Sequence, residues 1–598
     1  MKLINKFNLA NGLTDIVIFI SLLVLNTIQF SRAQDLNDLI PKKVPQQIAP
    51  TKEQSLQAIN RVANFGATND EDVILKKLKG LIFLDSPDAL KQEPATYMGT
   101  KILDVSLFTF LQDESFSVAA NTFIGLPVSR ESLKRLERMT SIHLKQLGRP
   151  FTVVFLPEQD ITDGYVQIVV LESNFTGEIE VQGNQYFSDE QYQQWIRQSK
   201  NDVINTHNLN QDIDWINRNP FRTATVIASP GDEQGTTKLI IKAREKKPVR
   251  VYTGFNNTGS QSTTEDRALV GVNWGNAFGL GHQLNMQLTS DLDFKRSKSL
   301  SGSYNFDTTW RHSVSVSAAY SETDGIVQEP FSLKGKSGQV GVFYTLPFSP
   351  KMTGNYTHSL NIGADFKVSD NNFDFADIPI SDNLTHVIHG KIQYSVSLVD
   401  SYGSTNGSIT LIAAPGGLTS RNEDEFFKLS RSNASANYIY STLNLTRNTQ
   451  LTGILSGWQW RVRGKLQLSN SNLIGSEQFG AGGSNSVRGY EEGEVFGDEG
   501  VLFSQEVIAP MMSLTKMANM TMPDSLSLFL FQDYAQTRSV VKLPDEKNFI
   551  LHSVGVGFRY QLAQLLTVNA SYGHQLKDSG SSDTGKDHRL HLSMQLSF

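Results

Sequence analysis

The chain ends on a regular alternation of apolar and polar residues. In its last segment, HRLHLSMQLSF, every second side chain is apolar and the chain stops on an aromatic residue. Successive side chains of a strand point to opposite faces, so a period of two predicts a strand with one apolar and one polar face. The apolar face would carry Leu590, Leu592, Met594, Leu596 and Phe598.

The same alternation recurs from Val249 to Phe598. In WQWRVRGKLQL, residues 458–468, tryptophan, valine and leucine alternate with arginine, lysine and glutamine. A soluble sandwich also alternates, but segments of about ten residues with aromatic ends and a charged face are typical of a barrel with lipid outside and a wet lumen. Such a barrel has to close, because an open edge in lipid leaves backbone groups unpaired.

The number of alternating segments is about sixteen, an even number that is typical of bacterial outer-membrane barrels. A barrel of this size is wide enough for an aqueous channel. The sequence therefore predicts an all-β antiparallel transmembrane barrel over residues 248–598. The expected strand centres lie near residues 252, 271, 286, 302, 316, 342, 361, 392, 410, 438, 462, 505, 530, 556, 569 and 594.

Ahead of the barrel, from residue 102 to about residue 247, helical patterns interrupt the alternation. In SRESLKRLERMTSIHLKQLG, Ser129 is an expected N-cap and Gly148 follows the expected helix end. Strand patterns come next, and a second unit then repeats the arrangement, which predicts two small α+β modules. The apolar residues at helical spacing in the first module are Leu133, Leu136, Met139, Ile142 and Leu147. The second module is expected to have strands at 177–183, 223–229 and 237–243 and helices at 188–198 and 209–220.

The N-terminus has the features of a secretory signal. A weakly basic start precedes an apolar run at residues 16–28, and Ser31, Arg32 and Ala33 form the small-x-small pattern of a cleavage site. We expect a signal peptide over residues 1–33. The alternative is a membrane anchor, but the run falls short of the ~20 apolar residues that a spanning helix needs.

Charge and chemistry exclude several other classes. A net charge of −6 indicates neither nucleic-acid binding nor a basic membrane-surface protein. The chain has no cysteine, which excludes disulfides and thiolate metal sites. No H-E-x-x-H pattern occurs, and GAGGSNS lacks the lysine and the context of a phosphate loop. We expect no enzyme activity, no catalytic residues, no cofactor and no metal.

One stretch breaks the barrel pattern. GAGGSNSVRGYEEGEVFGDEG, residues 480–500, is too rich in glycine for a strand or a helix, since glycine loses the most backbone entropy when it is ordered. It is expected to be a loop between the eleventh and twelfth strands. Its single arginine, Arg488, raises the question of what the side chain reaches.

Several motifs resemble one family. Residues 209–248, LNQDIDWINRNPFRTATVIASPGDEQGTTKLIIKAREKKP, are similar to the second polypeptide-transport-associated (POTRA) domain of the two-partner secretion transporters, the TpsB family of ShlB/FhaC/HecB-like haemolysin secretion/activation proteins. FLPEQDITDGYVQIVVLES resembles the end of the first such domain. VRGY resembles the tip of the family's lumenal loop, and FQDYA and SVGVGFRY its strands thirteen and fourteen.

The resemblance implies a contact between loop and barrel. In the family, the loop arginine pairs with the aspartate of the strand-thirteen motif, which corresponds here to Arg488 and Asp533. Glycines let the loop tip approach the barrel wall. The family's closing glycine is Ala535 in this chain, so the closeness of that approach is open. The implied contact residues are Val487, Arg488, Gly489, Tyr490, Phe531 and Asp533.

The resemblance also implies the function. We expect outer-membrane export of a large exoprotein, which two periplasmic POTRA domains capture and which crosses the barrel as an extended chain. The expected partners are this exoprotein (a TpsA-like adhesin, cytolysin or toxin), outer-membrane lipid and the barrel-assembly machinery, with no nucleic acid. An outer-membrane assembly factor of the same superfamily and a passive porin are the alternatives.

The expected domain plan has six parts. The fold class is α+β POTRA domains followed by the all-β barrel. Residues 51–65, TKEQSLQAINRVANF, are a candidate plug helix, a spacer or a frayed terminus. The expected segments are a signal peptide at 1–33, a linker or plug at 34–75, POTRA domains at 76–173 and 174–247, the barrel at 248–598, and its lumenal VRGY loop at 478–500.

Overall fold

A computed structural model describes residues 73–598, apart from 150, 234–235, 262, 327–330, 349–355, 376–377, 521, 545 and 581–586. The expected signal peptide (1–33) and the candidate plug (51–65) lie outside the described residues. The described chain falls into two compact units that divide between Lys247 and Pro248. Within the described ranges, no helix combines the length and the apolar character needed to cross a membrane.

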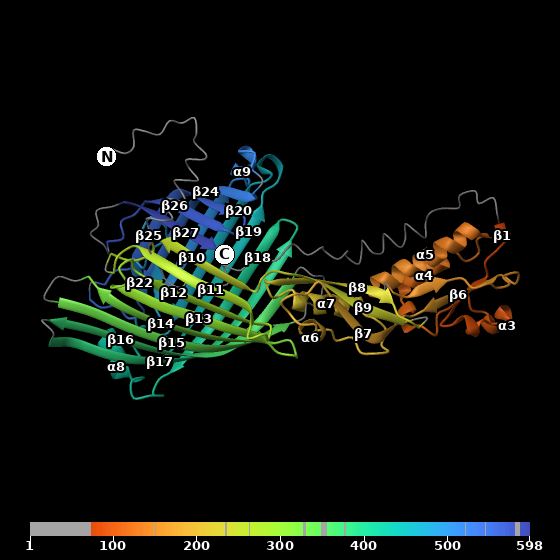
Figure 1. The fold of residues 1–598 in the computed structure, drawn as a ribbon, viewed down its shortest axis with the longest axis horizontal. Coiled ribbons are helices and arrows are strands. Elements are labelled where there is room, and N and C mark those ends of the chain that lie inside the picture. The colour runs from red at the N-terminus through yellow and green to blue at the C-terminus, as the bar shows by residue number, and fades with distance from the viewer. Residues whose placement is uncertain are drawn as a thin grey trace. The chain divides into compact units, whose positions relative to one another are not determined.

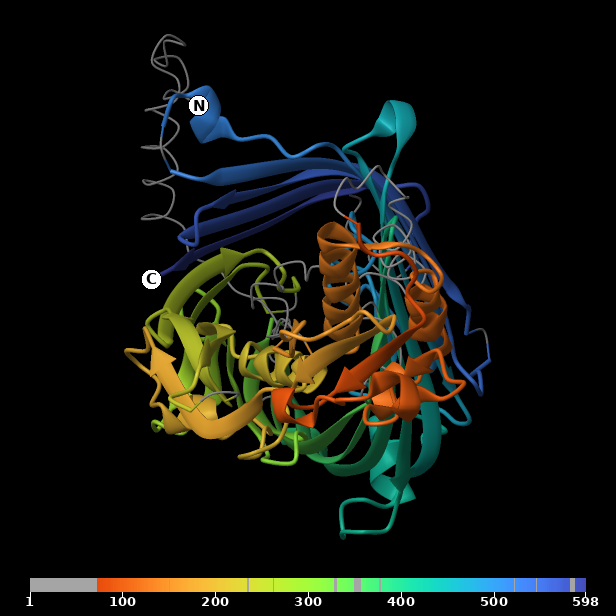
Figure 2. The ribbon, with the colours of Figure 1, turned by 90° about the vertical axis from the view of Figure 1, so that its right-hand side faces the viewer.

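The C-terminal unit is a closed barrel of sixteen antiparallel strands (Figures 1 and 2). This confirms the predicted strand number, and each expected centre lies within one strand. The strands are β10 (Val249–Asn256), β11 (Arg267–Ala277), β12 (His282–Ser290), β13 (Ser297–Asp307), β14 (Ser313–Gly325), β15 (Phe331–Phe348), β16 (Tyr356–Phe375), β17 (Ile378–Asp400), β18 (Gly403–Pro415), β19 (Asn437–Gln450), β20 (Gln459–Ser469), β23 (Glu499–Ile508), β24 (Asp524–Arg538), β25 (Phe549–Leu562), β26 (Leu566–Gln575) and β27 (His588–Ser597). Short helices between the strands are α8 (Asp424–Ser430), η5 (Gly453–Leu455) and α9 (Leu514–Met517).

The barrel closes where its last strand meets its first. β27 pairs with β10 in the register Tyr252↔Ser597. Beyond the regular strand, the Phe598 N–H donates to the Val251 carbonyl at 2.8 Å, and the Val251 N–H donates to the Phe598 carbonyl at 3.2 Å. The terminal residue therefore belongs to the seam that leaves the barrel without an open edge.

The two faces of the strands have the predicted polarity. On β24, Leu528 and Leu530 are exposed on the outside, whereas Phe529, Phe531 and Asp533 are buried within the barrel. Exposed apolar residues recur on the outward faces of the other strands, which is the surface that lipid requires. They include Leu300, Val340, Ile362, Ile392, Leu411, Leu443, Trp460, Phe503, Val556 and Leu590.

The first α+β module has a four-stranded sheet with three α-helices. The sheet order is β3-β2-β6-β5, and β2 is buried along its whole length. Ser129 caps α5 by accepting from the Ser132 N–H, and Gly148 follows the helix with φ +81°, as predicted. Leu147 is the C-cap residue and is exposed, so it lies beyond the helix that was expected to contain it. The elements are β1 (Val73–Leu75), β2 (Gly80–Leu84), η3 (Pro87–Ala89), α3 (Pro94–Met98), β3 (Leu103–Asp104), η4 (Thr109–Leu111), α4 (Glu114–Asn121), β4 (Val128–Ser129), α5 (Arg130–Gln146), β5 (Val153–Phe155) and β6 (Tyr165–Leu171).

The second module has a three-stranded sheet in the order β7-β9-β8. Two of its strands contain the predicted segments, and β7 ends one residue before the predicted end at 183. The second helix begins three residues earlier and ends four residues earlier than the predicted 209–220. The first helix is only four residues long, where eleven were expected. The Arg197 N–H donates to the Asp212 carboxylate at 2.9 Å instead of continuing the helix, and turns with i to i−3 bonds precede it. The elements are β7 (Asn174–Gln182), α6 (Glu190–Gln193), α7 (Thr206–Ile216), β8 (Arg222–Pro230) and β9 (Thr236–Glu245).

Candidate functional site: a loop fastened inside the barrel

The segment between β20 and β23, residues 470–498, lies inside the barrel and is called here the lumenal loop. Its side chains contact inward-facing residues of strands from β16 to β27, which only the interior of a closed barrel allows. It also contains a small hairpin, β21 (Phe479–Ala481) with β22 (Val495–Gly497). The expectation that this stretch has no strand was therefore wrong, because buried Phe479, Ala481 and Val495 supply apolar contacts at the base of the hairpin.

The structure brings Arg488 and Asp533 together. Arg488 Nε donates to Asp533 Oδ2 at 2.7 Å, and Nη2 donates to Oδ1 at 2.8 Å. The backbone N–H of Arg488 also donates to Oδ2, at 3.1 Å. The two side chains are 4% and 0% exposed. The arginine fork thus fits the carboxylate in the bidentate geometry that lysine cannot reproduce.

Glu506 on β23 is a second acceptor for the same arginine. Arg488 Nη1 donates to Glu506 Oε1 at 2.7 Å, and Arg559 Nη2 lies 2.8 and 2.9 Å from its two oxygens. Arg461 reaches the same carboxylate at 3.4 Å. Because this one carboxylate accepts from three guanidinium groups, Glu506 is the centre of the charge cluster.

Aromatic rings support the arginines from one side. The Arg488 guanidinium carbon lies 3.6 Å from the centre of the Phe531 ring, and that of Arg559 lies 4.0 Å from the centre of the Phe529 ring. These distances are typical of cation–π contacts. Phe531 and Asp533 share the inward face of β24, as expected for residues two apart on a strand.

The neighbours of Arg488 complete the tip of the loop. The Gly489 N–H donates to His591 Nε2 at 3.2 Å, and its carbonyl accepts from Gln575 at 2.8 Å. The Tyr490 hydroxyl accepts from the His552 N–H at 3.1 Å and also bonds to the Lys577 carbonyl. Val487 and Tyr490 are buried in one apolar cluster with Ala535, whose methyl group therefore packs under the tip.

A second attachment lies at Glu477, ahead of the hairpin. Its carboxylate accepts from Lys367 Nζ at 2.7 Å and from the Tyr440 hydroxyl at 3.0 Å. His389 Nε2 lies 3.5 Å away and bonds to Tyr438 at 2.7 Å, while its Nδ1 lies 3.1 Å from Asp365. Glu477, His389 and Asp365 are all buried. The middle of the lumenal loop is thus tied to β16, β17 and β19.

A third attachment closes the base of the loop. The Asp498 carboxylate accepts from the N–H groups of Leu473 at 2.8 Å and Val540 at 3.0 Å, and it pairs with Arg431. Arg431 also donates to the Leu473 carbonyl at 2.8 Å. Because Leu473 and Asp498 stand at opposite ends of the loop, this cluster joins them to each other and to the wall.

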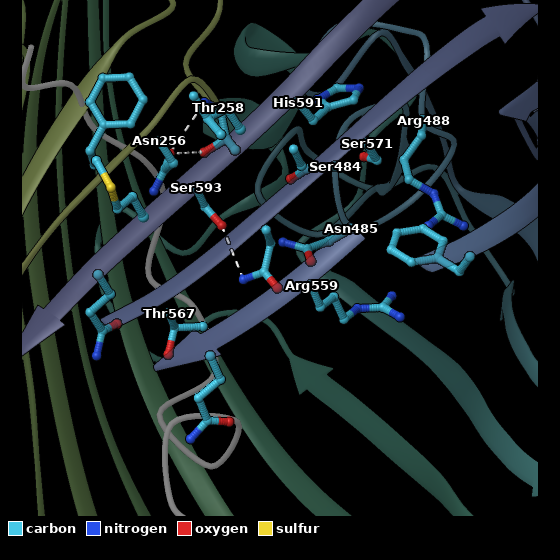
Figure 3. A pocket seen from close by; sticks show the side chains of 18 of the residues that line it. Asn256, Thr258, Ser484, Asn485, Arg488, Arg559, Thr567, Ser571, His591 and Ser593 are labelled. Atoms are coloured by element: carbon cyan, nitrogen blue, oxygen red, sulfur yellow. Dashed lines mark hydrogen bonds between the residues drawn. The ribbon is translucent and has the colours of Figure 1, made fainter. Parts of the chain in front are cut away.

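A cavity of about 670 Å³ adjoins the loop tip. Five arginines and Glu506 line it, together with hydroxyl and amide side chains. Figure 3 shows Arg488 and Arg559 lying together at one side of the cavity, with Ser484 and Asn485 of the loop beside them. Across the described ranges, His, Asp and Glu side chains do not gather in the groups of three that would hold a metal ion.

The sequence named only part of this site. VRGY and FQDYA pointed to Arg488 and Asp533, whereas Glu506, Glu477 and Asp498 had no motif of their own. Alternation places Glu506 on the polar face of its strand, and that signal alone could have marked it. Glu477 and Asp498 carried no signal, because their partners lie in distant parts of the chain.

Comparisons with known proteins agree with this architecture. A family profile described as haemolysin secretion/activation protein ShlB/FhaC/HecB matches residues 235–560, and a POTRA profile, surface antigen variable number repeat, matches residues 175–246. The heme/hemopexin transporter protein HuxB of Haemophilus influenzae is 22% identical over 511 residues, 83% of this chain and 86% of that protein. The outer membrane transporter CdiB of Dickeya dadantii is 23% identical over 412 residues, 65% and 68% of the two chains.

Solved structures show the same fold. CdiB from Escherichia coli superimposes with a TM-score of 0.68 at 14% identity, over 98% of each chain. CdiB from Acinetobacter baumannii gives 0.61 at 17% identity, again over 98% of each chain.

Proposed function

The chain belongs to the family of haemolysin secretion/activation proteins ShlB/FhaC/HecB, whose profile covers more than half of its 598 residues, and from this membership we propose how it moves its cargo. It is an outer-membrane transporter of two-partner secretion that exports a partner exoprotein. This membership favours export over the assembly factor and the passive porin. The route through the molecule is our proposal: capture at the N-terminal modules, passage as an extended chain, and a lumenal loop held at a fixed place.

Capture uses the edge strand β8 of the second module, whose sheet has its other edge at β7. In the order β7-β9-β8, strand β8 pairs within the described residues with β9 alone. Its outer N–H and C=O groups can therefore add a further strand, a mode of binding that relies on backbone bonds and needs little sequence specificity. This edge is the single observation that carries the capture step, and it suits an unfolded exoprotein whose sequence varies along its length.

Passage uses the wet interior. On β12 and β13 the inward side chains are hydroxyls and amides, such as Asn285, Gln287, Ser301 and Ser303. These groups hydrogen-bond to water and to a passing backbone without the strong hold of a charge. We propose that they form a wall with low affinity for the extended chain. This wall is uncharged, whereas the wall at β20 carries arginines.

The lumenal loop sets the width of that route. Arg488 and Asp533 fix its tip, and Val487, Gly489, Tyr490 and Phe531 shape the contact. We propose that this contact sets the register of the loop in the resting barrel. The role is positional, because each of these residues faces the wall or its neighbours within the loop.

The cargo is a large secreted protein of the adhesin, cytolysin or toxin type. HuxB is named as a heme/hemopexin transporter and CdiB as an outer membrane transporter. These names describe the relatives and do not identify the cargo of this chain. For this chain we propose only a dedicated exoprotein that arrives unfolded at the modules.

Deleting residues 76–245 tests the capture step. The barrel unit should still insert, because its strands pair only among themselves in the closed sheet. Export of the partner should stop, measured as exoprotein in the culture medium. Undiminished secretion from an inserted, truncated barrel would rule out capture at these modules.

A cross-linking experiment locates the capture edge. The chain has no cysteine, so Ile227→Cys on β8 introduces the only thiol. Tyr186→Cys is the matched control, because the two native side chains are 43% and 45% exposed but only Ile227 lies on the edge strand. Disulfides with single-cysteine exoproteins should form at position 227 and be scarce at position 186. Equal yields at both positions would contradict strand addition at β8.

A further inference from the structure

The cavity beside the loop tip carries more positive charge than its acidic neighbours balance. Its lining includes Arg250, Arg461, Arg463, Arg488 and Arg559, and Glu506 is the only acidic side chain in the lining. Asp533 lies behind Arg488 and is fully buried. Apart from Arg250, four guanidinium groups thus lie with two carboxylates around a space of about 670 Å³.

The arginines are held in place rather than free to turn into solvent. Glu506 bonds to Arg488 and Arg559 and reaches Arg461, and Arg461 Nε also donates to Asn448 at 2.8 Å. Held close together in a confined lumen, like charges raise the free energy of the barrel unless an anion offsets them. The arrangement of arginines around the cavity is therefore suited to bind an anion from outside the chain.

Donors remain for such a group. Arg463 lines the cavity, and its Nη2 donates to Ser504 at 3.1 Å. Its Nε is buried and has no hydrogen-bond partner among the described residues. Arg461 and Arg559 keep 33% and 34% of their side chains exposed, whereas Arg488 keeps only 4%. The loop contact thus leaves the outer faces of Arg461, Arg463 and Arg559 directed at the cavity.

We propose that this cavity is a binding site for an oxyanion. Guanidinium forks match the planar oxygens of a carboxylate and the oxygens of a phosphate, so both are suitable ligands. There are two sources of this chemistry: an acidic side chain of the exoprotein in transit, and free phosphate. The first source rests on the proposed passage of an extended chain through the lumen. Binding of free phosphate does not depend on that passage, and the two arms of the test distinguish the two sources.

The test measures binding to the full-length protein in detergent at low ionic strength. The probes are a fluorescent oligoglutamate peptide, an oligoglutamine peptide of equal length, and inorganic phosphate, which is measured by itself in calorimetry and as a competitor. Oligoglutamate should bind, oligoglutamine should not, and added salt should weaken the binding. Displacement by phosphate at similar concentration would assign the site to oxyanions in general, and failure of phosphate to displace would assign it to the chain in transit.

The variant Arg461→Gln/Arg463→Gln removes two cavity donors and keeps the Arg488 contacts. Its affinity for oligoglutamate should fall about tenfold or more for each arginine lost. The matched control Lys334→Gln/Lys336→Gln removes the same charge from two exposed lysines of β15 that do not line the cavity, and it should bind normally. Arg463→Gln alone serves if the double variant does not give a heat-modifiable barrel.

Three results would overturn the proposal. They are equal binding of oligoglutamate and oligoglutamine, no binding of either oligoglutamate or phosphate to the wild-type protein, and equal losses in the cavity variant and the lysine control. Undiminished secretion by the module deletion would contradict the proposed capture step and leave the phosphate arm unaffected, so the oxyanion site and the export route are judged separately.

Discussion

Gly489 of the lumenal loop and Gly573 of β26 meet backbone to backbone. A Cβ atom on Gly573 would lie 2.6 Å from the Gly489 nitrogen and 2.7 Å from the Arg488 carbonyl carbon. Gly489 itself has φ +99°, a conformation that side chains rarely adopt. The loop tip therefore reaches the wall only because neither residue carries a side chain.

Gly573→Ala should displace the loop tip without preventing barrel formation. The new methyl group meets backbone atoms that cannot rotate away, and overpacking of this kind costs about 1–3 kcal/mol. Secretion of the partner should fall while the heat-modifiable barrel stays abundant. Gly464→Ala on β20 is the control, because the nearest atom to its Cβ lies 4.0 Å away. Equal secretion by both variants would show that the close approach is unnecessary.

Arg488→Ala and Asp533→Ala should each lower secretion strongly. Loss of the arginine leaves Asp533 buried without its guanidinium partner, a change that costs about 3–5 kcal/mol. Asp533→Ala should be milder, because Arg488 keeps its bond to Glu506. Secretion by the double variant should be scarcely lower than secretion by Arg488→Ala, since both substitutions remove the same contact. Secretion and loop protection from protease are the measurements.

The control for this pair is Arg538→Ala. Arg538 lies on β24, as Asp533 does, and pairs with Glu499 on β23. Its side chain is 58% exposed, and exposed pairs contribute about 0–1 kcal/mol. It should secrete normally. Additive losses in the Arg488/Asp533 double variant would mean that the two residues act separately.

Glu477→Gln should loosen the middle of the loop while leaving its tip attached. The amide keeps the shape of the side chain but withdraws the charge from Lys367, whose Nζ lies 2.7 Å away. Hydrogen exchange should rise around residues 474–482 and remain low at residues 487–490. Glu499→Gln, at the mouth of the same loop, is a suitable comparison. A uniform rise along the whole loop would show that its attachments are not independent.

The first module should lose stability in mild acid because of His143. Burial lowers the pKa of this side chain, which is 3% exposed and has no hydrogen-bond partner at either ring nitrogen among the described residues. The pKa of His143 in the folded module lies below the unfolded value of about 6.5. The stability that the neutral side chain contributes is therefore present above that pH, and the free energy of unfolding decreases as the pH falls further. The loss is at most about 1.4 kcal/mol for each pH unit.

Urea unfolding of residues 73–247, which form one compact unit, measures this effect at pH 7.5 and pH 5.5. His143→Leu should flatten the pH dependence, because leucine fills a similar volume beside Phe116 and carries no proton. An unchanged pH dependence in His143→Leu would assign the acid sensitivity to the carboxylates instead.

Removal of Phe598 should reduce the amount of folded barrel. Its backbone makes both hydrogen bonds that extend the seam to Val251, and its side chain is exposed at 72% on the outside. The measurement is the heat-modifiable fraction in outer-membrane preparations. Phe598→Tyr, which keeps the backbone bonds and the aromatic ring, should insert normally. Full insertion of the truncated chain would show that the terminal residue is dispensable for assembly.

The barrel could be predicted strand by strand because lipid imposes one simple rule on every strand. Outward residues that face lipid have to be apolar, so the alternation is visible locally, as in Leu528 and Leu530 around the buried Phe529. The helix at 188–198 was predicted too long because its end is not determined by the local sequence. Its end depends on the bond from Arg197 to Asp212, a contact with a later helix that no local pattern contains.

The candidate site also has a part that the sequence predicts and a part that it does not. Arg488 and Asp533 sit in short motifs, so a resemblance could name them, although their role remains a prediction. Glu477 meets residues from three strands that lie 37 to 110 positions away in the sequence. Such a cluster forms only when the barrel closes, and neither composition nor periodicity indicates it.

The three attachments of the lumenal loop limit how it can be exchanged between relatives. At the tip, Arg488 needs Asp533 and Glu506, and the glycine at 489 needs the glycine at 573. Glu477 needs Lys367 and Tyr440 on other strands, and Asp498 at the base needs Arg431. A chimera that receives only the loop would carry charges without their acceptors. A functional graft therefore has to transplant the loop together with the wall residues that hold it.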